Sequence, residues 1–354
     1  MKRTFKVGLV GFGMVAERFH APLISVEPDL CLTHVVERHN ARSKEVYPEV
    51  TVVRTIDDLL VSEVDLVVIL TPNESHYPLA RKALEAGKHV VVDKPMTVTS
   101  SEADELIQVA RDHGRLLSVF HNRRWDGDFL TLKRLLGEER LGDVVEVESR
   151  FDRFRPEPKG GWRESDGAGT GVLYDLGSHL LDQAFNLFGL PSNVLADIQI
   201  QRTGVSADDW FRILLDYGRL RVCLGASCLA AGPMVRFRVR GTKGTWLKHG
   251  LDPQEARLAE GGKPGGSGWG AEPEHDWGTF FATVSSEKVA TVAGSYQDYY
   301  HLLAKALGEN GEPPVKADEA RNVIYGLELC RRSFEKRSWI PWEGGSHRAG
   351  ETLG

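Results

Sequence analysis

The sequence predicts an α/β protein with two domains, and three observations support this fold class. The 354 residues exceed what one hydrophobic core usually holds. Short apolar runs alternate with helical patterns up to Phe120, which is typical of a doubly wound parallel sheet. In the remainder, strand-like runs follow one another, which predicts an α+β domain with an open, mainly antiparallel sheet.

Composition narrows the class of protein further. Hydrophobic residues make up 41% and charged residues 27%, so a disordered or fibrous chain is excluded. The 44 Lys and Arg against 50 Asp and Glu give a net charge of −6, which argues against a nucleic-acid partner or a membrane surface. No apolar run approaches the ~20 residues of a membrane span, and no signal-peptide pattern is present. Because the four cysteines lack metal or disulfide spacing, we expect a cytoplasmic protein.

The first domain is expected to span residues 1–121. Helices are predicted at Ser75–Ala86 and Ser100–His113, because a glycine, the usual stop signal, follows each of them. Runs rich in Val, Ile and Leu without polar alternation predict parallel strands that are buried on both faces. These runs are Val7–Val10, Leu32–Val36, Thr51–Val53, Leu66–Leu70, His89–Val92 and Leu116–Phe120.

The second domain is expected to span residues 122–342. A loop is predicted at Gly261–Gly270, and the polar tail at 343–354 is expected to fray. Helical patterns cover 126–137, 174–188, 296–307 and 317–336. Strand patterns cover 144–151, 194–201, 210–216, 219–226 and 235–240.

A glycine-rich turn follows the first predicted strand. Gly11 suits a tight turn, Gly13 lets the backbone approach a pyrophosphate, and Ala16 permits close contact between helix and strand. The helix N-terminus supplies N–H groups and a positive dipole end. The segment Gly11-Phe12-Gly13-Met14-Val15-Ala16 therefore predicts a Rossmann dinucleotide site, and the alternative is a tight turn without a ligand.

Two residues at the end of the second predicted strand favour different nucleotides, one NAD and the other NADP. A carboxylate at Glu37 suits the ribose hydroxyls of NAD and repels a 2′-phosphate, whereas Arg38 suits the 2′-phosphate of NADP. NAD or NADP therefore stays open, with a lean toward NAD, and a solvated Glu–Arg pair is the alternative.

A lysine follows the fifth predicted strand in Asp93-Lys94-Pro95. Ligands of doubly wound sheets bind at the carboxyl ends of the strands. There Lys94 can hydrogen-bond a substrate oxygen and stabilise alkoxide character, while Pro95 fixes the backbone. A solvated surface lysine is the competing interpretation.

An aspartate and a histidine stand four residues apart in the predicted helix that follows the Gly167–Gly171 run. Asp175 and His179 therefore share one face, where a neutral imidazole can accept a proton and the carboxylate can orient it. Two alternatives are a histidine satisfied in the core and a metal site with Asp182. No further ligand cluster has suitable spacing, so no metal is expected.

Together these residues resemble the Gfo/Idh/MocA oxidoreductases, the relatives of glucose–fructose oxidoreductase and inositol dehydrogenase. The resemblance covers the chain to about residue 340. Three longer segments are similar to the branch that contains scyllo-inositol dehydrogenases, namely Ser118–Trp125, Phe151–Pro156 and Gly161–Glu164.

The resemblance implies roles for individual residues. Lys94 takes the place of the catalytic lysine, His179 that of the proton acceptor, and Asp175 that of its partner. It adds cofactor contacts at Thr71, Pro72, Asn73, His76, Asp93, Lys94, Asn122, Trp162 and Arg163. It places the substrate against Lys94, Arg123, Trp162, Arg163, Tyr174, Asp175 and His179. Asp93 stands where the family commonly has glutamate, and its shorter reach weakens the case for direct cofactor contact.

The expected activity is reversible hydride transfer between NAD(P) and a secondary alcohol or ketone of a sugar or an inositol-like cyclitol. One alternative is a glycosidase that transiently reduces a bound NAD, and another is a non-catalytic NAD(P)-sensing regulator. Family members associate through the second sheet, so the resemblance implies a homodimer or homotetramer. It also implies that the last helix packs near the first domain.

Overall fold

The structure is a computed structural model that describes residues 3–343. The chain forms two compact units, of which unit 1 holds the residues up to Asp126 together with Pro253–Gly270 and Gly294–Ile324. Unit 2 holds Gly127–Asp252, Ala271–Ala293 and residues 325–343. The expected second domain was one continuous stretch, whereas contacts assign three of its segments, 122–126, 253–270 and 294–324, to unit 1. Of the expected polar tail, residues 344–354 lie outside the described residues.

A six-stranded sheet forms the centre of unit 1, and all of its neighbouring strands are parallel. The strand order is β3-β2-β1-β4-β5-β6, the doubly wound order. The strands are β1 (Phe5–Val10), β2 (Leu30–Val36), β3 (Thr51–Val53), β4 (Leu66–Ile69), β5 (His89–Asp93) and β6 (Leu117–Phe120). All four residues of β4 are buried, which explains its unbroken apolar run. The predicted fold class of this part is confirmed.

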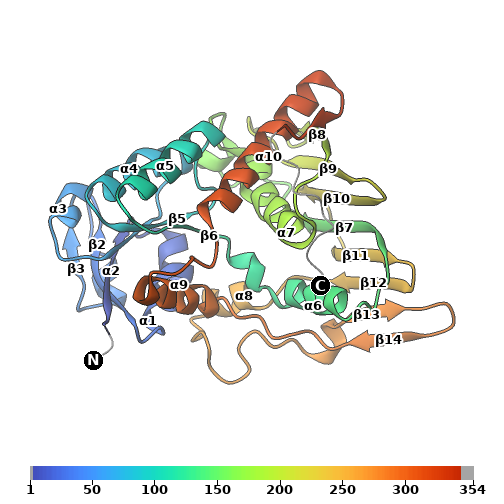
Figure 1. The fold of residues 1–354 in the computed structure, drawn as a ribbon, viewed down its shortest axis with the longest axis horizontal. Helices are drawn as coiled ribbons and strands as arrows, with labels where there is room; N and C mark the ends of the chain where they lie inside the picture. The colour runs from blue at the N-terminus through green and yellow to red at the C-terminus, as the bar shows by residue number, and fades with distance from the viewer. Residues whose placement is uncertain (1–2, 344–354) are drawn as a thin grey trace. The chain divides into compact units, whose positions relative to one another are not determined.

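Helices cover both faces of this sheet. Figure 1 shows α4 (His76–Glu85) and α5 (Ser100–Asp112) over one face and α1 (Ala21–Ser25) and α9 (Gln297–Glu309) over the other. A capping box fixes the start of α5, because Thr99 and Glu102 bond each other's backbone N–H groups. The remaining short segments of unit 1 are η1 (Ala16–His20), α2 (Ser43–Val46), α3 (Ile56–Leu60), η2 (Asn73–Ser75), η3 (Asn122–Trp125) and α8 (Gln254–Ala259).

Unit 2 is built on a nine-stranded sheet with the order β14-β13-β12-β11-β7-β10-β9-β8-β15. Neighbouring strands are antiparallel except β7 and β10, which confirms the predicted mainly antiparallel sheet. The five predicted strands are β7 (Val144–Asp152), β8 (Asn193–Gln199), β9 (Trp210–Tyr217), β10 (Leu220–Ser227) and β11 (Val235–Gly241). Four more were not predicted, namely β12 (Gly244–His249), β13 (Gly278–Phe281), β14 (Ser286–Val289) and β15 (Ile340–Pro341).

One face of this sheet is packed against helices α6 (Gly127–Gly137) and α7 (Ser178–Phe188), and α7 is preceded by the π-helical turn η5 (Leu173–Gly177). Along β9, Phe211 is fully buried while Trp210 is partly exposed, as expected for a sheet with one packed face. Phe237 and Val239 are also buried. The remaining elements are η4 (Trp162–Glu164), η6 (Glu274–Asp276) and α10 (Ala317–Lys336), whose first turns belong to unit 1.

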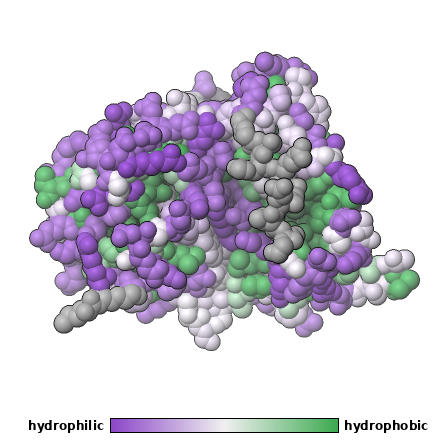
Figure 2. Space-filling view, in the orientation of Figure 1, coloured by the Kyte–Doolittle hydropathy of each residue, from purple (hydrophilic) through white to green (hydrophobic). Residues whose placement is uncertain are grey.

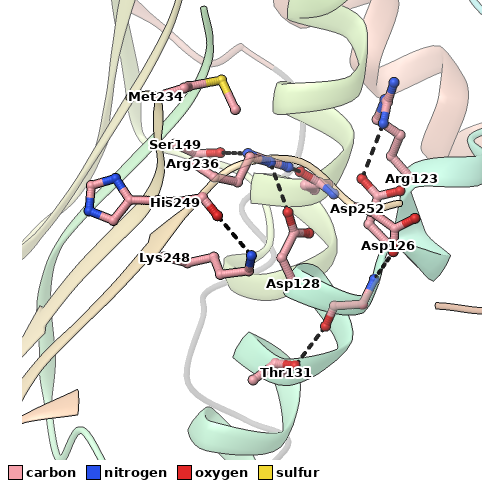
Figure 3. Close-up of polar contacts among 12 residues, drawn as sticks. Arg123, Asp126, Asp128, Thr131, Ser149, Met234, Arg236, Lys248, His249 and Asp252 are labelled. Atoms are coloured by element: carbon pink, nitrogen blue, oxygen red, sulfur yellow. Dashed lines mark hydrogen bonds and ion pairs between the residues drawn. The ribbon is translucent and has the colours of Figure 1, made fainter. Parts of the chain in front are cut away.

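A fully buried arginine crosses the core of unit 2. Figure 3 shows the Arg236 guanidinium from β11 between Ser149 of β7 and Asp128 of α6. Its Nη1 donates to Ser149 Oγ at 2.6 Å, and its Nε lies 3.2 Å from Asp128 Oδ2. The rings of Phe151 and Phe237 lie 4.2 and 4.0 Å from the guanidinium carbon. Since both charges of the Arg236–Asp128 pair are buried, each depends on the other.

Hydrophobic side chains also reach the surface of unit 2. The turn between β13 and β14 carries them in Figure 2, and Val284 there is 95% exposed. The expected homodimer or homotetramer remains a prediction. Within residues 3–343, no helix is long and apolar enough to cross a membrane.

His89 makes the stability of unit 1 depend on pH. Burial lowers the pKa of His89 from 6.5 to about 4, and its unprotonated Nδ1 accepts a hydrogen bond from the Leu116 N–H at 3.0 Å. Because the unfolded chain binds this proton more tightly, the stabilisation is present above pH 6.5 and is lost as the pH falls toward 4. We expect urea unfolding to show a smaller loss of stability between pH 7 and pH 4.5 for His89→Asn, whose amide oxygen accepts the same N–H without titrating. An equal loss in both proteins would contradict this.

Candidate functional site

The glycine-rich turn between β1 and η1 has the geometry of a phosphate cradle. Gly11 has a φ of +99°, and a Cβ there would lie 3.3 Å from the Leu70 carbonyl oxygen, so a side chain is disfavoured. A Cβ on Gly13 would meet no atom within 4 Å, so this backbone is open to a ligand. The Glu17 N–H donates to the Gly13 carbonyl at 3.0 Å and begins the helical segment. These residues fit a dinucleotide pyrophosphate.

The side chains of this turn differ in exposure. Phe12 is buried with its ring edge-on to Tyr47, Val15 is partly exposed and Ala16 is fully buried. Met14 is 49% exposed. Phe12 and Ala16 therefore shape the turn through packing, which leaves the backbone for ligand contact.

Glu37 and Arg38 diverge at the end of β2. Glu37 is only 6% exposed, and its carboxylate accepts hydrogen bonds from the backbone N–H groups of Arg42 and Ser43, each at 3.0 Å. Arg38 is exposed. The two residues that gave opposite signals in the sequence thus occupy different environments.

The ends of β4 and β5 are joined by a buried histidine. His76 is 1% exposed, and its ring nitrogens lie 2.8 Å from the carbonyl oxygens of Thr71 and Pro95. Burial lowers its pKa, although Asp93 and both carbonyls oppose this shift. His76 therefore links the backbone that follows β4, next to Asn73, to the backbone that follows β5, next to Lys94. Of its neighbours, Asn73 is buried and Pro72 is exposed.

Asp93 lies within a buried polar chain beside Lys94. Its Oδ1 is 3.5 Å from Nε2 of His20, whose Nδ1 is 2.6 Å from the Tyr300 hydroxyl. Burial opposes ionisation of Asp93, but His20, Lys94 and His76 outweigh it and hold its pKa below the usual value. Lys94 itself is partly exposed. The ionised Asp93 carboxylate therefore interacts electrostatically with Lys94 from a buried position.

Asn122 and Arg123, in η3, are both 6% exposed. Arg123 Nη2 donates to Glu255 at 2.6 Å, and its Nη1 lies 3.4 Å from Asp126 (Figure 3). Burial opposes the charge of Arg123, but Tyr296 and these two carboxylates hold its pKa well above its ordinary value. Arg123 therefore ties η3 to α8 in unit 1.

In unit 2, Asp175 and His179 lie one turn apart, in η5 and at the start of α7. His179 is 5% exposed and its ring lies 6.5 Å from that of Phe151, whereas Asp175 is partly exposed. Burial raises the pKa of the neighbouring Tyr174 to about 12, so this hydroxyl stays protonated at neutral pH.

Two arginines approach the Asp175 carboxylate. Arg153 lies 3.9 Å from Oδ2 and Arg163 lies 4.0 Å from Oδ1. The Arg163 guanidinium also stacks over Trp162, with 4.6 Å between its carbon and the ring centroid. The structure thus brings Trp162, Arg163 and Asp175 together, while Tyr174 and His179 lie near Asp175 in the chain.

Sequence reasoning missed several supporting residues. Asp208 accepts the Leu173 N–H at 2.7 Å and so fixes the start of η5. A Cβ on Gly171 would clash with this carboxylate at 2.4 Å, which explains the glycine. His20 was detectable as a histidine on the apolar side of its helix, but Tyr300 gave no local signal because 280 residues separate the two. Residues 3–343 hold no group of three His, Cys, Asp or Glu side chains that could bind a metal.

Comparison with known proteins gives two family matches that together span most of the chain. Residues 5–121 match the model described as oxidoreductase family, NAD-binding Rossmann fold. Residues 133–342 match the C-terminal alpha/beta domain of the same Gfo/Idh/MocA oxidoreductase family.

Similar proteins cover nearly the whole chain. The uncharacterized oxidoreductase YdgJ of Escherichia coli is 46% identical over 96% of this chain and 99% of its own. The scyllo-inositol 2-dehydrogenase (NADP(+)) IolW of Bacillus subtilis is 38% identical over 96% of both. The solved structure of yvaA from Bacillus subtilis, described as an oxidoreductase, has a TM-score of 0.93 at 36% identity and covers 97% of this chain and 99% of its own. The chain is therefore an oxidoreductase of the Gfo/Idh/MocA family with an NAD-binding Rossmann domain.

Proposed function

We propose that the protein catalyses reversible hydride transfer between NAD(P) and a secondary alcohol or ketone of a sugar or an inositol-like cyclitol. The observation that carries this proposal is that one chain holds three features: an open glycine-rich turn and a lysine after β5 in unit 1, and an Asp–His pair where η5 meets α7 in unit 2. The full-length similarity to IolW, named as an NADP-linked scyllo-inositol dehydrogenase, supports the substrate class.

The proposed role of unit 1 is to bind the dinucleotide and one substrate oxygen. When bound, the nicotinamide supplies the site that accepts or gives up the hydride. The backbone from Gly11 to Ala16 holds the pyrophosphate, with Thr71, Pro72, Asn73 and Asn122 as further proposed cofactor contacts. The Lys94 ammonium donates a hydrogen bond to the reacting oxygen and stabilises the negative charge that develops there.

The proposed role of unit 2 is to move the proton. His179 accepts the hydroxyl proton during oxidation and returns it during reduction, while Asp175 favours the protonated imidazole. Arg153 and Arg163 lie about 4 Å from Asp175, which supports an ionised carboxylate. Trp162, Arg163 and Tyr174 are proposed to line the substrate, and Tyr174 donates hydrogen bonds because it stays protonated. Arg123 has its guanidinium on Glu255, which favours an indirect contribution.

The decisive experiment measures initial rates with a panel of inositols and aldoses, using NAD⁺ and NADP⁺ separately. We expect the absorbance of the reduced nicotinamide to increase in proportion to the alcohol oxidised. Cleavage of a glycoside without net change in nicotinamide would instead indicate the glycosidase. A protein that binds the nucleotide but turns over no polyol would indicate the regulator.

A further inference from the structure

We infer that the protein prefers NADP over NAD, with Arg38 and not Glu37 meeting the adenosine ribose. This inference rests on the proposed function, since it concerns the same dinucleotide site. It reverses the lean toward NAD that the glutamate suggested from the sequence.

The Glu37 carboxylate accepts hydrogen bonds from the loop that follows β2. Oε1 accepts the Arg42 N–H at 3.0 Å, and Oε2 accepts the Ser43 N–H at 3.0 Å and the Ser43 hydroxyl at 2.5 Å. The side chain is 6% exposed. Three donors already use most of the acceptor positions of this carboxylate, and little of the side chain is exposed, so Glu37 has little capacity left for the ribose hydroxyls. Glu37 therefore organises the loop that follows β2.

That loop presents cations beside the glycine-rich turn. The Gly11 N–H donates to the Val36 carbonyl at 3.1 Å, so the loop begins next to the turn. Arg54 braces it by donating to the carbonyls of Glu37 at 2.9 Å and Asn40 at 2.6 Å.

The two arginine side chains of this loop are exposed, whereas the glutamate side chain is buried. Arg38 and Arg42 are exposed, and Arg42 pairs with Glu17 at 3.0 Å, whereas the Glu37 carboxylate is buried under its donors. An incoming 2′-phosphate therefore meets a guanidinium at the surface. Arginine binds phosphate through two parallel hydrogen bonds, which a ribose hydroxyl cannot match.

The experiment measures dissociation constants of NADPH and NADH by nucleotide fluorescence at fixed ionic strength, independently of turnover. We expect NADPH to bind at least about tenfold more tightly than NADH. Arg38→Ala is expected to weaken NADPH by about 10–100-fold and to leave NADH nearly unchanged. Arg111→Ala is the matched control, because this arginine lies on α5 with 62% of its side chain exposed and pairs with Asp318.

Glu37→Gln separates the two roles of the glutamate. If Glu37 organises the loop, this variant lowers the melting temperature and leaves the ratio of the two dissociation constants nearly unchanged. If Glu37 reads the ribose, NADH binding weakens and NADPH binding strengthens, and the inference is overturned. Tighter NADH than NADPH in the unaltered protein would also overturn it while leaving the proposed function intact. Failure to bind either nucleotide would contradict the proposed function itself.

Discussion

His179→Ala is expected to lower kcat by about 10²–10⁴-fold, the usual contribution of a general base, and to leave the NAD(P) dissociation constant nearly unchanged. The reason is that the proposed function assigns nucleotide binding to unit 1 and proton transfer to unit 2. His179 belongs to α7 of unit 2, whereas the glycine-rich turn and the loop after β2 belong to unit 1. Steady-state kinetics on a verified substrate, together with nucleotide titration, measure the two effects separately.

The matched control is His275→Ala, an exposed histidine in η6 of the same unit. Asp175→Asn keeps the shape of the side chain but removes the negative charge that favours a protonated His179. We expect it to lower kcat less than His179→Ala does and to shift the pH profile of kcat. Full activity of His179→Ala with unchanged thermal stability would show that another group takes the proton.

Asp128→Ala is expected to destabilise the protein by about 3–5 kcal/mol, because it removes a buried carboxylate from beside the buried Arg236 guanidinium. Both side chains of this pair have an exposed fraction of 0%. The hydroxyl of Ser149 and the amide oxygen of Gln183 still accept hydrogen bonds from Arg236, but neither carries a charge. Urea unfolding followed by tryptophan fluorescence measures the change in the free energy of unfolding.

Glu146→Ala is the control for this prediction, since Glu146 pairs with Arg240 on the same sheet in an exposed place and should cost at most about 1 kcal/mol. The double variant Asp128→Leu with Arg236→Met removes both charges and should recover much of the lost stability. If Asp128→Ala costs no more than Glu146→Ala, the buried pair contributes little and the interpretation of this core is wrong.

The sequence predicted the sheet of unit 1 well because each strand carries its own signal. A parallel strand buried on both faces is an unbroken apolar run, as in Leu66–Ile69 and Val90–Val92. The strands β12 to β14 were missed because glycine and polar residues interrupt their apolar residues; in β12 the buried residues are Trp246 and Lys248, and in β14 only Val289 is buried. Neither apolar continuity nor strict alternation marks such strands.

The candidate site was predictable where the chemistry depends on neighbouring residues. The glycine-rich turn and the spacing of Asp175 and His179 are local patterns; the structure places the turn after β1, and it places Asp175 in the π-helical turn η5 and His179 in α7, where one helix was expected. The partners of Glu37 and Asp93 were not predictable, because a helical or strand period states which face is apolar but not what lies against it. The three tyrosines at 296, 299 and 300 illustrate this, since all are fully buried within unit 1.

Residues near the C-terminal end of the sequence complete the buried hydrogen bonds of unit 1, and this has a consequence for folding during synthesis. Tyr300 bonds to His20, Tyr299 donates to Ser118 at 3.0 Å, and the Ser118 hydroxyl donates to the Val315 carbonyl at 2.8 Å. During synthesis, His20 and Ser118 emerge from the ribosome long before Tyr299, Tyr300 and Val315 are added to the chain. The polar groups of His20 and Ser118 therefore stay hydrated, and unit 1 cannot complete its buried hydrogen bonds, until nearly the whole polypeptide has been synthesised.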